Sequence, residues 1–241
     1  MDTNFTKIAI ATEGREGLYS VTRSDAGNWT SGIVGVGRLV GSMRGISAPT
    51  MAHWLGSADL VTPSVMRNID HKTFMAIAQA YYWRPLNGDA LPAGLQRMLF
   101  DFGFNSNVSR AARQLQEIVG LSGADVDGNI GSKTLYAIRQ DKDGKGGRAS
   151  AGFISPEWAK HAQADADVAP DGKLGPVSLL AMSGPAWGFR MQIYALASLQ
   201  EQAYRSFKGF REYGDGWLNR LRWRVAASLA DLDAATSAAA A

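Results

Sequence analysis

The chain has 241 residues, of which 46% are hydrophobic and 20% charged, and these globular proportions exclude a disordered or fibrous protein. The absence of cysteine excludes disulfides, cysteine-ligated zinc and a cysteine nucleophile, and three separated histidines do not predict a histidine-based metal site. A formal net charge of +3 is too small to predict a strong nucleic-acid binder.

The start of the chain lacks the charged region and apolar run of a signal peptide, and no stretch is apolar over a membrane-spanning length. We therefore expect synthesis in the cytoplasm without stable membrane insertion. Residues 203–224 carry a local excess of positive charge. This basic segment is either a solvated helix face or a surface that helps the protein to approach a polyanion.

The first third of the chain mixes helices with a glycine-rich segment. Apolar residues at helical spacing predict a helix from Thr3 to Glu13. Glycines punctuate residues 19–45 and predict loops with a short hairpin-like element. Two helices are expected next, one opening at Ala48 and one over residues 64–82.

The rest of the chain is predicted to be mostly helical after a proline-rich break at residues 84–92. Residues 141–152 are rich in glycine and serine among charged residues and predict a loop. The alanine-rich end is expected to fray. Helices are expected over residues 93–102, 109–119, 186–207 and 216–232.

An internal repeat relates residues 127–138 to residues 171–182. In each copy an Asp-Gly turn leads through an apolar residue and a glycine into a helix, whose opening turn carries Thr134 or Ser178. The repeat is either the same turn chemistry used twice or a duplicated binding unit.

A pair of carboxylates in the glycine-rich region suggests an acid and base pair for cleavage of a glycosidic bond. Glu16 sits at a predicted helix end, Asp25 lies on a predicted loop, and Thr30 follows. A shielded Glu can donate a proton to a glycosidic oxygen, while an exposed Asp stays ionised and activates water that Thr30 holds. Glu13 is an alternative acid, and the plain alternative is that Glu16 is one more surface carboxylate.

Three stretches around these residues resemble the N-terminal region of glycoside hydrolase family 108, a family of N-acetylmuramidases that includes many phage endolysins. They are Glu16-Gly17-Leu18-Tyr19-Ser20, then Asp25-Ala26-Gly27-Asn28-Trp29-Thr30, then Gly41-Ser42-Met43-Arg44-Gly45-Ile46-Ser47. The second half is similar to the predicted peptidoglycan-binding domain that usually follows. Its matching segments include Tyr82-Trp83-Arg84, Phe100-Asp101-Phe102-Gly103, residues 111–116, Asp127-Gly128 and residues 216–220.

The resemblance implies that Glu16 is the catalytic acid and that Asp25 is the family's loop Asp. It also departs from the family pattern, because Leu18 replaces a glycine, the loop before Gly45 is longer, and residues 144–175 are an elaboration. These departures leave the identity of the base and the shape of the cleft open.

Contacts to a glycan are expected through stacking on aromatic rings and hydrogen bonds to hydroxyls. Asp101 and Asn105 lie four residues apart on a predicted helix and would share a face. Core packing is the alternative for each aromatic residue, above all for Trp83. Arg113, Gln114 and Gln116 are interpreted as a set that includes helix surface residues without a special role. The expected substrate-binding residues are Tyr19, Ser20, Trp29, Tyr82, Trp83, Asp101 and Asn105.

We therefore predict a mostly α-helical protein of the α+β lysozyme-like kind, with two lobes. Residues 1–92 are expected to form the catalytic lobe and residues 93–234 a helical peptidoglycan-binding lobe with the two Asp-Gly units. Residues 235–241 are expected to form a flexible tail. The reaction implied by the resemblance needs neither a metal nor an organic cofactor.

The predicted activity is hydrolysis of the β-1,4 bond between N-acetylmuramic acid and N-acetylglucosamine, with Glu16 as acid and Asp25 with Thr30 handling water. The alternatives are a lytic transglycosylase that uses Glu16 alone and a non-catalytic wall-binding or virion structural protein. The expected partner is bacterial peptidoglycan and not nucleic acid. A monomer is expected that reaches periplasmic peptidoglycan after holin-dependent release.

Overall fold

The structure is a computed structural model, and it describes residues 3–143 and 149–240. The chain divides into two compact units, of which the first ends at Arg84 and the second begins at Pro85. The sequence prediction placed this boundary at residue 92. Within the described ranges the chain is mostly helical, as predicted, and its β-pairing consists of isolated bridges. No described helix is both long enough and apolar enough to cross a membrane.

The first unit packs short helices around a buried core that includes Phe5, Ile8, Phe74 and Trp83. Its helices are α1 (Thr3–Glu13), α2 (Ala48–Leu55), α3 (Pro63–Arg67) and α4 (His71–Ala78), and its short helical turns are η1 (Ala26–Asn28), η2 (Ala58–Leu60) and η3 (Gln79–Trp83).

The single helix predicted over residues 64–82 is two helices, α3 and α4, and this corrects the sequence prediction. The break has a local cause. Asp70 adopts an extended backbone and its Oδ1 accepts a hydrogen bond from the Thr73 N–H (2.8 Å), which starts α4. That hydrogen bond is also the main reason why the pKa of Asp70 is lowered.

The glycine-rich segment of the first unit forms a loop closed by backbone pairing, in line with the predicted hairpin-like element. Ser20 and Ser42 exchange two backbone hydrogen bonds (2.9 and 2.8 Å), and Trp29 pairs with Leu39. Gly41 has a φ of +87°, and a Cβ there would come within 2.6 Å of the Tyr19 ring. A glycine at this position is therefore required for the ring to pack.

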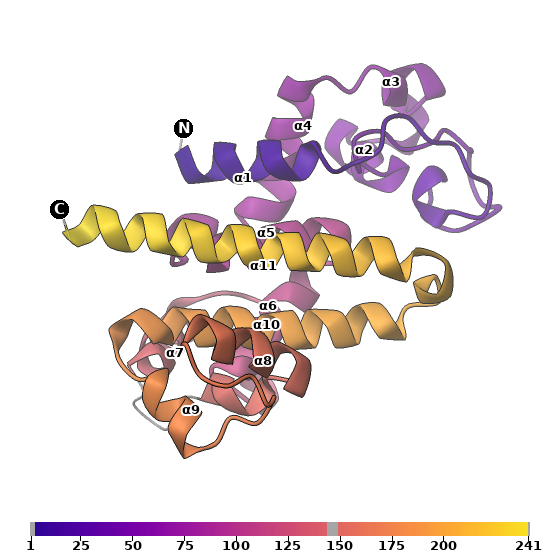
Figure 1. The fold of residues 1–241 in the computed structure, drawn as a ribbon. Coiled ribbons are helices and arrows are strands. Elements are labelled where there is room, and N and C mark those ends of the chain that lie inside the picture. Colours follow the sequence, from indigo (N-terminus) through magenta and orange to yellow (C-terminus); the bar gives the residue numbers. More distant parts are fainter. Residues whose placement is uncertain (1–2, 144–148, 241) are drawn as a thin grey trace. The chain divides into compact units, whose positions relative to one another are not determined.

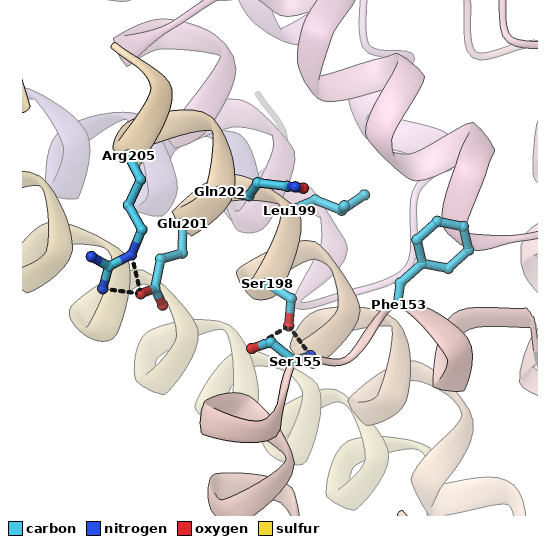
Figure 2. Close-up of a pocket in the computed structure, with 7 residues that line it drawn as sticks. All are labelled: Phe153, Ser155, Ser198, Leu199, Glu201, Gln202 and Arg205. Carbon is cyan, nitrogen blue, oxygen red and sulfur yellow. Dashed lines mark hydrogen bonds and ion pairs between the residues drawn. The ribbon is translucent and has the colours of Figure 1, made fainter. Parts of the chain in front are cut away.

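The second unit is a helical bundle built around α10 (Pro185–Ser206), which packs against five other helices. In Figure 1, α10 and α11 (Phe210–Ala240) run antiparallel and side by side. At the other side of α10, the N–H of Ser155 donates to Ser198 Oγ (3.0 Å; Figure 2). The other elements are η4 (Gly88–Ala90), α5 (Leu95–Asn105), α6 (Val108–Ile118), η5 (Gly123–Asp125), α7 (Ser132–Lys142), η6 (Ala149–Phe153), α8 (Pro156–Asp165) and α9 (Pro176–Ala181).

Residues 235–240 continue α11, and the fraying expected for this tail stays a prediction. Alanine has the highest helix propensity, so an alanine-rich extension prolongs a helix that packing has already started. Residues 144–148 of the predicted loop lie outside the described residues, and η6 begins at Ala149.

The internal repeat is a repeated structure, in which one buried glutamine holds each Asp-Gly loop. Gln116 is 1% exposed and its amide oxygen accepts from the Gly128 N–H (2.8 Å). The Gln116 amide nitrogen donates to Asp127 Oδ1 (2.7 Å), Asn129 O (3.0 Å) and Thr134 Oγ1 (3.3 Å). Gln116 is therefore a structural residue of the interior and not a surface residue.

Gln163 repeats these contacts in the second copy. Its oxygen accepts from the Gly172 N–H (2.8 Å), and its nitrogen donates to Asp171 Oδ1 (2.7 Å), Lys173 O (3.0 Å) and Ser178 Oγ (3.0 Å). The glutamine bond is the main cause that lowers the pKa of Asp171, as the Gln116 bond does for Asp127. The loop itself therefore uses the carboxylate of each Asp-Gly turn.

We expect Gln116→Met and Gln163→Met each to lower the free energy of unfolding by about 1–3 kcal/mol, because a thioether leaves the buried loop groups without hydrogen bonds. Urea denaturation followed by circular dichroism measures the change. Gln202→Met, at an exposed position of α10, is the matched control and should change stability by less than about 0.5 kcal/mol. Equal effects of all three variants would contradict a structural role of the two buried amides.

Candidate active site

Glu16 lies just after α1, in a turn where its N–H donates to Glu13 O (3.0 Å). The nearby phenol is that of Tyr82, at the end of η3. Burial raises the pKa of Tyr82, a hydrogen bond with Thr50 acts in the opposite direction, and the negative charge of Glu16 raises it further. Tyr82 is therefore hydrogen-bonded to Thr50, and the carboxylate of Glu16 lies near enough to act on the Tyr82 phenol electrostatically.

The polar contacts of Thr50 continue toward Asp25 through Ser47, the residue that caps α2. Ser47 Oγ and Thr50 Oγ1 are 2.8 Å apart and share a hydrogen bond. Asp25 Oδ1 accepts from the Gly27 N–H (2.8 Å). A Cβ on Gly27 would lie 3.2 Å from Asp25 Oδ1 and 3.4 Å from Ser47 Cβ, so the loop packs closely against the start of α2.

Ser47 and Thr50 are candidate site residues that the sequence reasoning missed. Ser47 belongs to the Gly-Ile-Ser stretch on which the resemblance rests, and that stretch was the available signal. Thr50 sits three residues after Ser47 in the first turn of α2, where two side chains at this spacing lie on one face. That helical spacing lets the Ser47 hydroxyl bond to Thr50, which in turn bonds to Tyr82.

Glu13, the alternative acid, is held as an ion pair. Its side chain is 9% exposed, Oε1 accepts from Arg44 Nη1 (2.5 Å), and Oε2 contacts His71 Nδ1 (2.6 Å). Arg44 also donates to Ile69 O (3.1 Å). Both carboxylate oxygens of Glu13 are therefore engaged, and this side chain joins α1 to the loop and to α4.

Thr30 and Trp29 are both 8% exposed and support the glycine-rich loop. Thr30 Oγ1 accepts from the Arg38 N–H (3.1 Å), and the Trp29 indole donates to Arg23 O (2.9 Å). The structure thus gives each side chain a role in the loop. The catalytic role of Thr30 and the sugar contact of Trp29 stay predictions.

Tyr19 and Ser20 lie in the same loop. The Tyr19 hydroxyl donates to Val40 O (2.9 Å), and the guanidinium of Arg67 lies 4.6 Å from the centre of its ring. Gly41 packs against that ring as well. Ser20 is exposed and uses its backbone for the pairing with Ser42, so its hydroxyl stays a predicted contact to substrate.

Trp83 belongs to the core of the first unit, and this corrects the expectation that it stacks on a sugar. Its side chain is 1% exposed, and its ring centre lies 5.3 Å from that of Phe5. A ring with both faces covered offers no surface to a sugar. Core packing, the alternative from the sequence, describes this tryptophan.

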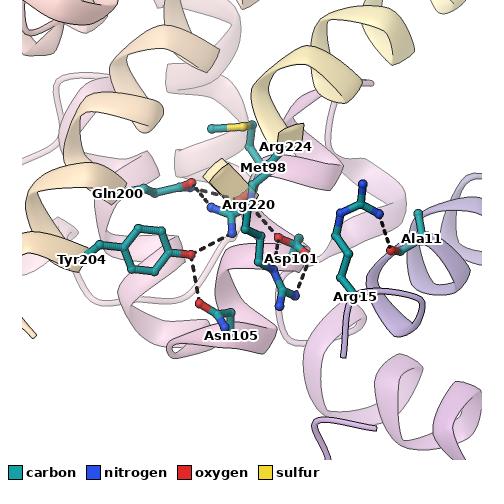
Figure 3. A network of polar contacts seen from close by, with 9 residues as sticks. All are labelled: Ala11, Arg15, Met98, Asp101, Asn105, Gln200, Tyr204, Arg220 and Arg224. Carbon is teal, nitrogen blue, oxygen red and sulfur yellow. Dashed lines mark hydrogen bonds and ion pairs between the residues drawn. The ribbon is translucent and has the colours of Figure 1, made fainter. Parts of the chain in front are cut away.

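Asp101 is a structural anion within the second unit, and this corrects the expectation of a sugar contact. Asp101 is 0% exposed and accepts hydrogen bonds from Arg220 Nη2 (2.8 Å) and from Arg224 Nε (2.7 Å; Figure 3). The residue Arg224 is also 0% exposed. Burial by itself would raise the pKa of Asp101, but the charges and hydrogen bonds of Arg224 and Arg220 outweigh it and hold this pKa well below its ordinary value.

Asn105 belongs to the same network. Its Oδ1 accepts from the Tyr204 hydroxyl (3.0 Å), which in turn accepts from Arg224 Nη2 (2.9 Å; Figure 3). Arg224 also donates to Gln200 Oε1 (2.6 Å). These bonds join α5, α10 and α11, so the face shared by Asp101 and Asn105 points into the bundle.

Among the residues that the structure describes, no three histidine, aspartate or glutamate side chains are grouped so that they could hold a metal ion. The contacts described above define a candidate site of Glu16, Asp25, Ser47, Thr50 and Tyr82.

Residues 9–106 match the family model for glycosyl hydrolase 108. The matched segment contains Glu16, Asp25 and Tyr82, and the match supports a glycosidase. The family suggests an activity of the peptidoglycan hydrolase kind.

The whole chain is similar in structure to SagA of Brucella abortus, with a TM-score of 0.65 and 22% sequence identity. The alignment covers 96% of this chain and 97% of SagA. At this level of identity the similarity shows a shared fold. No curated protein matches the chain.

Proposed function

We propose that the protein is a peptidoglycan hydrolase that cleaves the β-1,4 bond between N-acetylmuramic acid and N-acetylglucosamine. The observation that carries this proposal is the position of Glu16, a carboxylate inside the matched segment and beside the Tyr82 phenol. Both carboxylate oxygens of the neighbouring Glu13 are engaged, by Arg44 and by His71, so we assign the acid to Glu16.

In the proposed reaction Glu16 donates its proton to the oxygen of the leaving sugar while water attacks the anomeric carbon. Asp25 takes the proton from that water. Thr30 Oγ1 already accepts from the Arg38 N–H, so the hydroxyl hydrogen of Thr30 is the atom that would orient the water. Tyr82 and Thr50 would hold the Glu16 side of the site in place.

The second unit would then supply peptidoglycan binding. In each Asp-Gly loop the glutamine engages one carboxylate oxygen, Oδ1, while the aspartate stays exposed. A sugar contact through these loops could therefore use the second carboxylate oxygen. Action on periplasmic peptidoglycan as a monomer belongs to the same proposal.

Digestion of purified Gram-negative sacculi in water labelled with a heavy oxygen isotope tests the reaction. We expect soluble muropeptides with reducing N-acetylmuramic acid ends that carry the heavy oxygen, because hydrolysis transfers the oxygen of water to the anomeric carbon. Products that end in anhydro-muramic acid and lack the label would identify a transglycosylase. Binding to sacculi without any soluble product would make the protein a wall-binding protein and contradict the proposal.

A further inference from the structure

A pocket of about 340 Å³ opens in the second unit on the side of α10 that faces η6 and the start of α8. Figure 2 shows side chains from these three elements arranged around it. Two contacts fix its walls, the Ser155 N–H to Ser198 Oγ (3.0 Å) and the Trp158 indole to Glu201 Oε2 (2.9 Å). The pocket is lined by Phe153, Ser155, Ser198, Leu199, Glu201, Gln202 and Arg205.

The charged groups of the pocket form an oriented pair. Glu201 Oε1 accepts from both Arg205 Nε (2.8 Å) and Arg205 Nη2 (2.6 Å), while Oε2 accepts from Trp158. The Glu201 side chain is 18% exposed, but the Arg205 side chain is 55% exposed. Nη1 of Arg205 takes no part in the ion pair, so a fixed guanidinium edge is offered to solvent.

The remaining groups define which ligand would suit this edge. A guanidinium recognises the planar carboxylate with two parallel hydrogen bonds, and it does so better when its orientation is already fixed. Ser155 and Gln202 add a hydroxyl and an amide for peptide groups, and Phe153 and Leu199 add apolar surface for a short side chain. The volume is in the range of small-ligand pockets.

We propose that this pocket binds the free carboxylate end of a short peptide, such as the peptide stem of peptidoglycan. The identity of the peptide rests on the proposed function, whereas the preference for a carboxylate rests on the geometry of Arg205 and Glu201. The pocket would hold the stem, and the candidate active site in the first unit would act on the glycan strand.

Isothermal titration of the full-length protein with N-acetylmuramyl tripeptide, and with the same compound carrying a C-terminal amide, tests the pocket. The wild type is expected to bind the free acid about tenfold more tightly than the amide, because one charge-assisted contact is worth roughly that factor. Arg205→Gln should abolish the difference. Arg211→Gln, at an exposed arginine of α11, is the matched control and should keep it.

A second variant tests the pocket even if Arg205→Gln fails to fold. Gln202→Trp keeps the ion pair of Glu201 and Arg205 and fills the pocket from an exposed position, so it should weaken binding of the free acid at least tenfold. Equal affinity of the wild type for acid and amide, or unchanged binding by both variants, would overturn the proposal. Displacement of the peptide by inorganic phosphate at equal concentration would overturn the peptide assignment in favour of a general anion site.

The ligand contains no glycosidic bond between sugars, so the titration is independent of hydrolysis. If the wild type dissolves sacculi but binds acid and amide equally, the proposed peptide site is wrong and the proposed hydrolase activity stands. Discrimination between acid and amide without any hydrolysis would support the pocket and overturn the enzyme.

Discussion

Glu16→Gln is expected to lower the rate of sacculus hydrolysis by about 100- to 10,000-fold, the range for loss of a general acid. Glutamine has nearly the same shape and fills the same space, but its amide cannot transfer a proton to the leaving oxygen. The measurement is the initial rate of turbidity loss, with circular dichroism to establish that the variant is folded. Binding to sacculi should be unchanged.

Glu13→Gln is the matched control, because it makes the same change three residues away. We expect it to keep hydrolysis within about tenfold of the wild type and to lower the melting temperature, since it removes the charge that joins Arg44 and His71. If Glu13→Gln were inactive at an unchanged melting temperature while Glu16→Gln stayed active, the acid would be Glu13 and the assignment of Glu16 would be wrong.

Asp101→Asn is expected to lower the free energy of unfolding by about 3–5 kcal/mol, the range for removal of one partner from a buried ion pair. The change leaves Arg224, which is 0% exposed, without the carboxylate that neutralises it. Urea denaturation of the two proteins at neutral pH measures the difference.

The pH dependence of this difference follows from the lowered pKa of Asp101. A carboxyl group whose pKa is lowered on folding stabilises the protein fully above its unfolded pKa, and this contribution is lost as the pH falls through the folded value. The advantage of the wild type over Asp101→Asn should therefore be constant near neutrality and shrink below the ordinary value of 3.8.

Asp233→Asn is the matched control for Asp101→Asn. Asp233 of α11 forms an ion pair with Arg190 of α10, but the Asp233 side chain is 57% exposed. Loss of this ion pair should therefore lower the free energy of unfolding by no more than about 1 kcal/mol. A loss of the same size in both variants would show that burial of the Asp101 pair adds nothing to stability.

The sequence predicted best those features that depend on near neighbours. The helices α6 and α10 were predicted from apolar spacing, and the Asp-Gly repeat follows from local turn chemistry, whereas α8 was not predicted. Features that depend on distant partners were missed. Trp83 and Asp101 look like exposed functional residues until Phe5 and Arg224 are placed beside them.

The candidate site shows the same limit. The sequence names Glu13 and Glu16 as possible acids, but only the positions of Arg44 and His71 separate them. The break before Asp70 was missed because apolar spacing continues across it, whereas the cap that starts α4 is a single side-chain contact.

The two glutamine-held loops also indicate how much length variation this part of the protein tolerates. Gln116 precedes its aspartate by 11 residues and Gln163 by 8, yet both make the same four contacts. The connection between helix and loop can therefore gain or lose residues without disturbing the loop. Insertions and deletions among relatives should concentrate in these connections, and a search for further copies should fix the glutamine and the Asp-Gly pair while leaving their separation free.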